Sequence, residues 1–230
     1  MEDYIHLHVH THYSILDGQS KINNLVDKAI KDGMKGMAIT DHGVMFGIKE
    51  FADYCAKKNK ERKANGEEPF KPIFGCEMYV ARRKQTDKVK EMHDNSGYHL
   101  VVLAKNYNGY KNLIKLVSNA WVDGYYYRPR TDREQLEKYH EDLIVCTACL
   151  AGEIPAKIRK GDIEGAREAC LWYKNLFGED FYLELQRHEV TDPTLIANRE
   201  AYPLQQQVNK VLMQFSKEYG IKLVCTNDSH

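Results

Sequence analysis

Short apolar runs rich in β-branched residues alternate along the chain with longer segments in which apolar residues recur every three to four positions. This alternation is typical of repeated βα units around a parallel sheet. The runs that we interpret as strands are residues 4–8, 36–40, 73–80, 100–104, 143–147, 181–186 and 223–226. We expect these seven strands to form an α/β barrel.

The segments of helical period each carry one apolar stripe, which we assign to the core. The stripe of the first such segment is made by Ile22, Leu25, Val26, Ala29 and Ile30. Gly33 follows it as a stop signal. Two polar stretches, 57–71 and 82–97, interrupt the alternation and are interpreted as surface excursions. No linker divides the sequence, so residues 1–230 are predicted to form one domain.

Composition narrows the possible functions without choosing one. Lys+Arg and Asp+Glu both total 33, so net charge does not predict a surface that gathers polyanions, and any contact with nucleic acid would be local. The first residues lack the basic and apolar regions of a signal peptide, and no apolar run approaches the roughly 20 residues that span a bilayer. We therefore expect a cytoplasmic protein without a membrane partner. The six scattered cysteines are interpreted as reduced thiols, most of them in the core.

Metal-ligand residue types follow most of the predicted strands, as expected for a barrel whose ligands lie at the carboxyl ends of its strands. These residues are His8, His10, Asp17, His42, Cys149, Asp228 and His230, while Glu77 falls within the third run. Residues two apart in a strand point the same way. The pairs His8/His10 and Asp228/His230 can therefore face a single metal cluster.

A mixed set of imidazoles and carboxylates with at most one thiolate suits Zn, Mn or Fe, and such clusters support phosphoester hydrolysis. An H-x-H pair alone is a weak indication, because a His-rich strand edge is often only polar surface. Its combination with Thr-Asp-His-Gly and a second D-x-H favours a metal site. His6, His12, His93 and His140 fit no such position and are interpreted as solvated or core histidines. His188 lies at the same end of the predicted barrel as the metal-ligand candidates. Its position fits contact with one of those residues or with phosphate as well as it fits direct binding to a metal.

Taken in order, these motifs resemble those of the PHP (polymerase and histidinol phosphatase) family, and within it the N-terminal domains of bacterial DNA polymerase III alpha subunits. The matching segments are His8-Val9-His10-Thr11, Tyr13-Ser14, Leu16-Asp17-Gly18, Ala38-Ile39-Thr40-Asp41-His42-Gly43, Gly75-Cys76-Glu77, Tyr98-His99-Leu100, Ala148-Cys149-Leu150-Ala151-Gly152 and Thr226-Asn227-Asp228-Ser229-His230. The resemblance implies a distorted (β/α)7 TIM-like barrel. It also implies that residues 1–230 are a PHP domain cut from a much longer polymerase chain.

The resemblance further implies up to three divalent metal ions held by nine ligands. These are His8, His10, Asp17, His42, Glu77, His99, Cys149, Asp228 and His230, and none is replaced. An intact set resembles domains with metal-dependent 3′–5′ exonuclease activity, with the DNA primer 3′ end, the remaining polymerase domains and other replisome subunits as partners. Asp17, His42 and His188 are the catalytic candidates. His99 precedes its apolar run, so a strictly parallel strand would place it at the wrong end of the barrel, and its ligand role rests on the resemblance.

The segment from Tyr125 to Arg130 joins aromatic residues to two arginines, a combination that can stack bases and pair phosphates. Tyr127, Arg128 and Arg130 are thus candidates for nucleic-acid binding, and the alternative is loop anchoring within the domain or against a polymerase domain. For the chain as a whole there are two alternatives to the exonuclease. One is a catalytically silent, metal-stabilised scaffold, and the other is a free-standing histidinol-phosphatase-like phosphoesterase.

Overall fold

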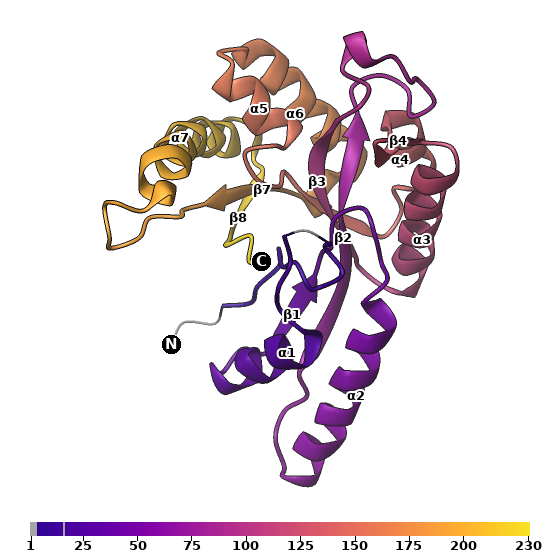
Figure 1. The fold of residues 1–230 in the computed structure, drawn as a ribbon, viewed down its shortest axis with the longest axis vertical. Helices are drawn as coiled ribbons and strands as arrows, with labels where there is room; N and C mark the ends of the chain where they lie inside the picture. Colours follow the sequence, from indigo (N-terminus) through magenta and orange to yellow (C-terminus); the bar gives the residue numbers. More distant parts are fainter. Residues whose placement is uncertain (1–3, 16) are drawn as a thin grey trace.

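The computed structural model describes residues 4–15 and 17–230, so Leu16 of the first motif lies outside the described residues. A curled sheet forms the centre of the molecule and helices pack around its outside (Figure 1). The strands are β1 (Gly36–Ile39), β2 (Lys71–Ala81), β3 (Gly97–Ala104), β4 (Tyr125–Tyr126), β5 (Arg128–Thr131), β6 (Leu143–Cys146), β7 (Phe181–Gln186) and β8 (Lys222–Thr226). The α-helices are α1 (Ile22–Lys31), α2 (Ile48–Ala64), α3 (Tyr107–Val122), α4 (Arg133–Tyr139), α5 (Glu153–Arg159), α6 (Ile163–Phe177) and α7 (Tyr202–Tyr219). Two 3₁₀ helices, η1 (Lys90–Met92) and η2 (Gly178–Asp180), and a π-helix, η3 (Ala197–Ala201), complete the described elements.

The strands pair in the order β4-β5-β2-β3-β6-β7-β8, and β1 pairs with β2. Strand β2 is long enough to serve two parallel neighbours, because its first residues pair with β1 and its last with β5. Strands β6, β7 and β8 are parallel to one another. The α/β fold expected from the sequence is confirmed in the form of this curled, barrel-like sheet.

The first predicted strand, residues 4–8, is not a continuous strand in the structure. The segment instead forms single parallel bridges to two neighbours, His6 to Met37 and Val9 to Ser229. It thereby lies between the end of β8 and β1, and Figure 1 shows the chain passing between these two edges.

The prediction of a wholly parallel sheet is wrong for β3, which is antiparallel to both β2 and β6. A parallel crossover requires a connection of a dozen or more residues, usually with a helix that packs on the sheet. The link from β2 to β3 is the polar stretch around η1, which carries no apolar stripe for such packing. The chain therefore turns back, and the first residues of β3 lie beside the last residues of β2, with His99 paired to Tyr79.

Three apolar clusters stabilise this arrangement. The largest packs helices α3 to α7 on the outside of β2, β3, β6 and β7, and a second joins α1 and α2 to β1. The third lies within the curl of the sheet and is built from Ala38, Val101, Leu103, Cys146 and Ala148. In the described part of the chain, no helix combines the length and apolar character that a membrane crossing requires.

Candidate metal centre

The segment that carries His8 and His10 is fixed by backbone hydrogen bonds at one end of the curled sheet. The His10 amide donates to the Ser229 carbonyl at 2.7 Å, and the Ser229 amide donates to the His8 carbonyl at 3.2 Å. Between the two histidines, the Val9 amide donates to Thr40 Oγ1 at 2.9 Å. Both imidazoles are completely buried. The two ends of the described chain are thus joined at the site itself.

Each residue of Thr40-Asp41-His42-Gly43 has a distinct structural role. Thr40 binds the backbone of Val9, and Asp41 accepts hydrogen bonds from the Thr11 amide at 2.6 Å and from Ser14 Oγ at 2.7 Å. His42 faces the cluster. Gly43 has φ +62°, and a Cβ there would lie 2.7 Å from Pro129, so only glycine suits this turn.

Glu77 lies at the centre of the cluster and is 1% exposed. Its Oε1 is 3.2 Å from His8 Nε2 and 2.9 Å from His99 Nδ1. Its Oε2 is 2.6 Å from His42 Nδ1 and 3.4 Å from His10 Nε2. One carboxylate in contact with four imidazoles has the geometry of a bridging metal ligand. Burial alone would raise the pKa of Glu77, but His8, His42 and His99 hold that pKa well below its usual range.

The antiparallel direction of β3 explains how His99 reaches the site although it precedes its apolar run. His99 in β3 is paired with Tyr79, two residues from Glu77 on β2. The Cys149 thiol approaches Glu77 from the loop after β6. Cys149 Sγ lies 3.8 Å from Glu77 Oε1 and 3.6 Å from His99 Nδ1. Burial, followed by the charges of Glu77 and Asp228, raises the pKa of this thiol well above its ordinary value.

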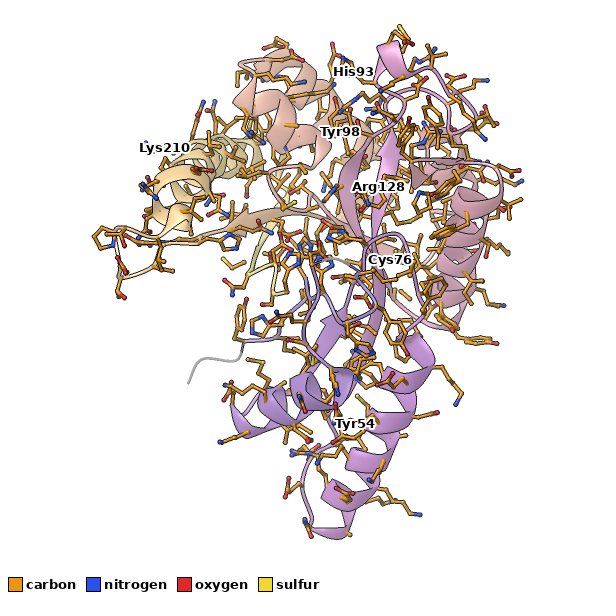
Figure 2. All side chains as sticks on the ribbon, in the orientation of Figure 1. Tyr54, Cys76, His93, Tyr98, Arg128 and Lys210 are labelled. Carbon is orange, nitrogen blue, oxygen red and sulfur yellow. The ribbon has the colours of Figure 1, made fainter. Side chains whose placement is uncertain are left out.

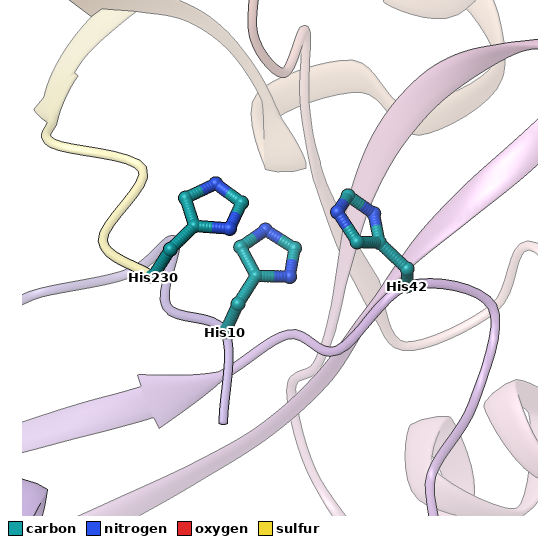
Figure 3. Close-up of side chains that lie close together, drawn as sticks. All are labelled: His10, His42 and His230. Carbon is teal, nitrogen blue, oxygen red and sulfur yellow. The ribbon is translucent and has the colours of Figure 1, made fainter. Parts of the chain in front are cut away.

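Asp228 and His230 close the cluster from the segment after β8. Asp228 Oδ1 lies 3.1 Å from His8 Nε2, 3.3 Å from His10 Nε2 and 3.3 Å from His230 Nε2. Figure 3 shows His230, His10 and His42 side by side although they come from three separate segments. The His10 and His230 rings stack at 4.4 Å between centroids. Asp17 Oδ2 lies 2.9 Å from His42 Nε2 and 3.8 Å from His230 Nδ1.

The backbone is strained at two places in this cluster. Ala148, next to Cys149, and Asp228 both have positive φ, at 60° and 50°. Non-glycine residues rarely adopt this conformation, and it costs of order 1 kcal/mol or more at each position. The strain is held by specific contacts, since the Ala148 amide donates to Glu184 Oε2 at 3.0 Å. The fold thus gives up stability to aim donors into the site.

The donor set fits metal ions. Among the described residues, the buried atoms left without a hydrogen bond include His8 Nε2, His10 Nε2, His42 Nδ1, Glu77 Oε2 and Asp228 Oδ1, all in this cluster. Buried polar atoms normally have a hydrogen-bond partner. Several buried nitrogen and oxygen atoms without one, gathered in one place, indicate a site for a bound cation. Three overlapping groups have suitable spacing: His8 with His10 and Asp228, His10 with His42 and His230, and His42 with Glu77 and His99.

The hydrogen bonds behind the cluster orient its imidazoles toward a metal. His8 Nδ1 donates to Glu184 at 2.6 Å, and His10 Nδ1 donates to Ser14 Oγ at 3.1 Å. Protons on Nδ1 leave the Nε2 lone pairs directed into the cluster, which is how metal-binding histidines are usually supported. Sequence reasoning did not assign Glu184, Ser14 or Asp41 this supporting role. A signal was present for Glu184, because Glu184 and Gln186 share one face of an otherwise apolar strand.

His188, a catalytic candidate from the sequence, lies beside the cluster rather than in it. Its Nε2 donates to the Asn227 carbonyl at 2.8 Å, and its Nδ1 accepts from Gln205 Nε2 at 3.0 Å. Both ring nitrogens are therefore engaged. The contact with Asn227 holds the backbone immediately before Asp228.

The three candidate nucleic-acid contacts differ in their environment. Arg130 is completely buried and donates to the carbonyls of Gly124, Gln85 and Asp87. It therefore anchors the surrounding loops, which was the alternative weighed for this segment, and offers no surface to nucleic acid. Tyr127 and Arg128 lie at the surface, and both line a pocket next to the cluster.

This pocket has a volume of about 540 Å³. Asp17, His42 and His99 line it, so these three members of the cluster are accessible from solvent. The rest of its lining includes aromatic residues, with Trp121 and Tyr125 among them. The arrangement is a buried donor cluster that opens into a substrate-sized cavity.

Comparison with known proteins places these features in a family. Residues 6–188 match the PHP domain family. The chain is 44% identical over 227 residues to the DNA polymerase III subunit alpha of Borreliella burgdorferi and 38% identical over 228 residues to that of Treponema pallidum, in each case over 99% of this chain and 18% of the relative. The chain thus spans less than a fifth of the length of these relatives.

Solved structures show the same fold at low sequence identity. The crystal structure of a candidate metal-dependent phosphoesterase from Bifidobacterium adolescentis superposes with a TM-score of 0.54 at 14% identity, covering all of this chain and 88% of the other. An amidohydrolase from Chromobacterium violaceum gives a TM-score of 0.52 at 13% identity, covering 98% of this chain and 87% of the other. The sequence motifs, the curled sheet and the family match agree: the chain belongs to the PHP domain family.

Proposed function

We propose that this chain is the PHP domain of a longer replicative DNA polymerase chain, and that its site hydrolyses phosphodiesters as a metal-dependent 3′–5′ exonuclease at the primer end. The observation that carries the proposal is the set of orphaned buried donors around Glu77. The polymerase context is supported by relatives named DNA polymerase III subunit alpha. The remaining domains of the same chain, the DNA primer 3′ end and other replisome subunits are the proposed partners.

The nine predicted ligands all lie in or beside this cluster, which supports up to three divalent ions of the Zn, Mn or Fe type. Such ions, when bound, polarise phosphoryl oxygens and lower the pKa of water so that it can attack phosphorus near neutral pH. Glu77 and Asp228 supply the negative charge that holds cations in the buried part of the site. Glu184 fixes the orientation of His8.

Asp17 and His42 are proposed as the catalytic residues that meet the substrate. Both line the pocket, and Asp17 is the most exposed of the nine ligands, with 44% of its side chain accessible. Their contact at 2.9 Å keeps the carboxylate and the imidazole in fixed relative positions at the floor of the pocket. His188 is proposed to act indirectly, by holding the Asn227 carbonyl and thus the position of Asp228.

The scaffold alternative predicts a closed site, as in structural metal centres whose ligands leave no position for substrate. Here three ligands line a cavity that is open to solvent, and this favours an enzyme. A free-standing phosphoesterase that acts on a small phosphate ester is less well supported, because the relatives that match 99% of this chain are named as polymerase subunits.

The test is metal content together with nucleotide release from a 3′-mismatched primer, with zinc, manganese or iron added. We expect Asp228→Asn to lower nucleotide release by about 100-fold and to reduce the metal content, because Asp228 contacts three histidines of the cluster. Asp53→Asn, which changes an exposed carboxylate on α2, is the matched control and should change neither. Metal binding without release with any of the three ions would support the scaffold instead.

A further inference from the structure

The pocket beside the candidate metal centre is lined on part of its wall by aromatic residues. Hydrolysis of a phosphodiester does not by itself require them. Trp121, near the end of α3, is fixed to the backbone beside a predicted ligand. Its indole Nε1 donates to the Gly43 carbonyl at 2.8 Å, and Gly43 follows the ligand His42. The indole stacks on Tyr125 with 5.4 Å between ring centroids and 19° between planes. A rigid aromatic pair is thereby fixed beside the metal ligands.

These rings are presented to solvent rather than packed in the core. The exposed fractions are 41% for Trp121, 46% for Tyr125, 59% for Tyr127 and 64% for Phe46, and all four line the same pocket. Single exposed aromatic residues are ordinary, whereas several gathered around one cavity indicate a binding surface. Tyr127 also has φ +62°, a conformation that tyrosine rarely adopts.

One cation accompanies the rings. The Arg128 guanidinium lies 5.6 Å from the centroid of Tyr79, which itself lies 6.1 Å from the His42 ring. Figure 2 shows Arg128 near the middle of the molecule, above Cys76 in this view. In residues 4–15 and 17–230, no carboxylate forms an ion pair with Arg128, in contrast to Arg133, which pairs with Glu153. Arg128 is therefore available to an anionic ligand.

From this juxtaposition, we propose that Trp121, Tyr125, Tyr127 and Phe46 form a base-stacking subsite for the unpaired 3′-terminal nucleotides of a single-stranded nucleic acid, with Arg128 on a phosphate. Stacking on aromatic rings with a nearby cation is how single strands are bound without sequence preference. In a duplex the faces of each base are covered by its neighbours, so this subsite selects unpaired ends. The inference rests on the proposed function, since it names the substrate state that the same site accepts.

The test combines a change in the protein with a change in the substrate. In the full-length chain loaded with manganese, kcat/KM for nucleotide release is measured on a single-stranded oligonucleotide and on the same strand with abasic residues in its two 3′-terminal positions. We expect the wild type to prefer the base-bearing strand by about tenfold or more. The Tyr125→Leu/Tyr127→Leu variant should lose that preference.

The matched control is Tyr107→Leu, which removes an exposed tyrosine at the first residue of α3 and should keep the full preference. A wild type that cleaves both strands equally well, or a double variant that keeps the preference, would overturn the subsite. Equal loss of activity on both strands in the double variant would also overturn it, and would assign the rings to the fold or to contact with another protein domain.

A second measurement separates this inference from the proposed function. If the wild type cleaves neither strand, the exonuclease proposal fails, but stacking is still measurable with 2-aminopurine at the 3′ terminus, whose fluorescence falls when it stacks. Stronger quenching by the wild type than by the Tyr125→Leu/Tyr127→Leu variant supports the aromatic subsite. Equal quenching by the two proteins overturns it.

Discussion

The two ends of the curled sheet share the same strands but have opposite chemistry. At one end, the side chains of Leu103, Ile144 and Val224 line an apolar cavity of about 690 Å³. At the other end of the same strands, a few residues away along the chain, lie the donors of the candidate metal centre. In β7, the apolar end includes Tyr182 and the polar end begins at Glu184. In β8, Val224 belongs to the apolar end, and Thr226 and then Asp228 belong to the polar end.

The difference shows how little sequence separates packing from ligand binding. Among the described residues, five of the ten buried side-chain atoms without a hydrogen bond lie at the metal end, whereas none belongs to a residue that lines the apolar cavity. Strand geometry makes this possible because a step of two residues keeps the same face while advancing about 7 Å. The apolar end can therefore stabilise the sheet, while the polar end holds the strained backbone positions and the buried charged groups.

The largest effect is expected from neutralising the centre of the polar end. Glu77→Gln keeps the shape of the side chain but removes the charge that contacts four histidines. We expect nucleotide release to fall by about 1000-fold, equivalent to ~4 kcal/mol, with loss of bound metal measured by elemental analysis. Glu153→Gln neutralises another poorly exposed carboxylate, whose side chain pairs with Arg133 and Lys157 rather than with the cluster, and should retain the metal. Retained metal in Glu77→Gln would refute a bridging role.

The apolar end should respond in stability rather than in chemistry. Leu103→Ala opens a cavity at a side chain that is 3% exposed, and such changes lower the free energy of unfolding by about 2–5 kcal/mol. Urea denaturation measures the loss. Metal content per folded molecule should stay at the wild-type value, because Leu103 contributes no ligand. A change in metal stoichiometry would show that the two ends are not independent.

The sequence predicted the residues of the polar end better than it predicted the arrangement of the strands. Most of the candidate donors could be picked out because His, Asp, Glu and Cys in or just after apolar runs violate the hydrophobic pattern, whereas His99 came from the family resemblance. The structure brings all nine candidates together. The direction of β3 could not, because an apolar run carries no sign of direction. The signal was the preceding polar link without a helix, and the awkward position of His99 was its consequence.

Supporting residues were also beyond the reach of the pattern. Asp41 and Glu184 are buried carboxylates, but their partners Ser14 and His8 lie 27 and 176 residues away. Such contacts depend on the closure of the sheet by the N-terminal segment, which short-range periodicity does not describe. Arg130 is the converse case: its neighbours in sequence suggested a surface loop, and only its three carbonyl contacts reveal that it is an internal anchor.

The smallest effect is a pH dependence confined to the polar end. Burial lowers the pKa of His8, but Glu184 and Glu77 outweigh it and raise that pKa well above its usual value, and burial raises the pKa of Cys149. The metal-free site therefore holds protons that a metal must displace, so the apparent affinity for metal should rise with pH, by up to about tenfold per pH unit for each proton released.

Zinc titration calorimetry between pH 5.5 and 8 in two buffers counts those protons. Glu184→Gln removes a carboxylate that raises the pKa of His8 and should flatten the slope, whereas Glu153→Gln should leave it unchanged; an affinity independent of pH in the wild type would contradict the protonated, metal-free state.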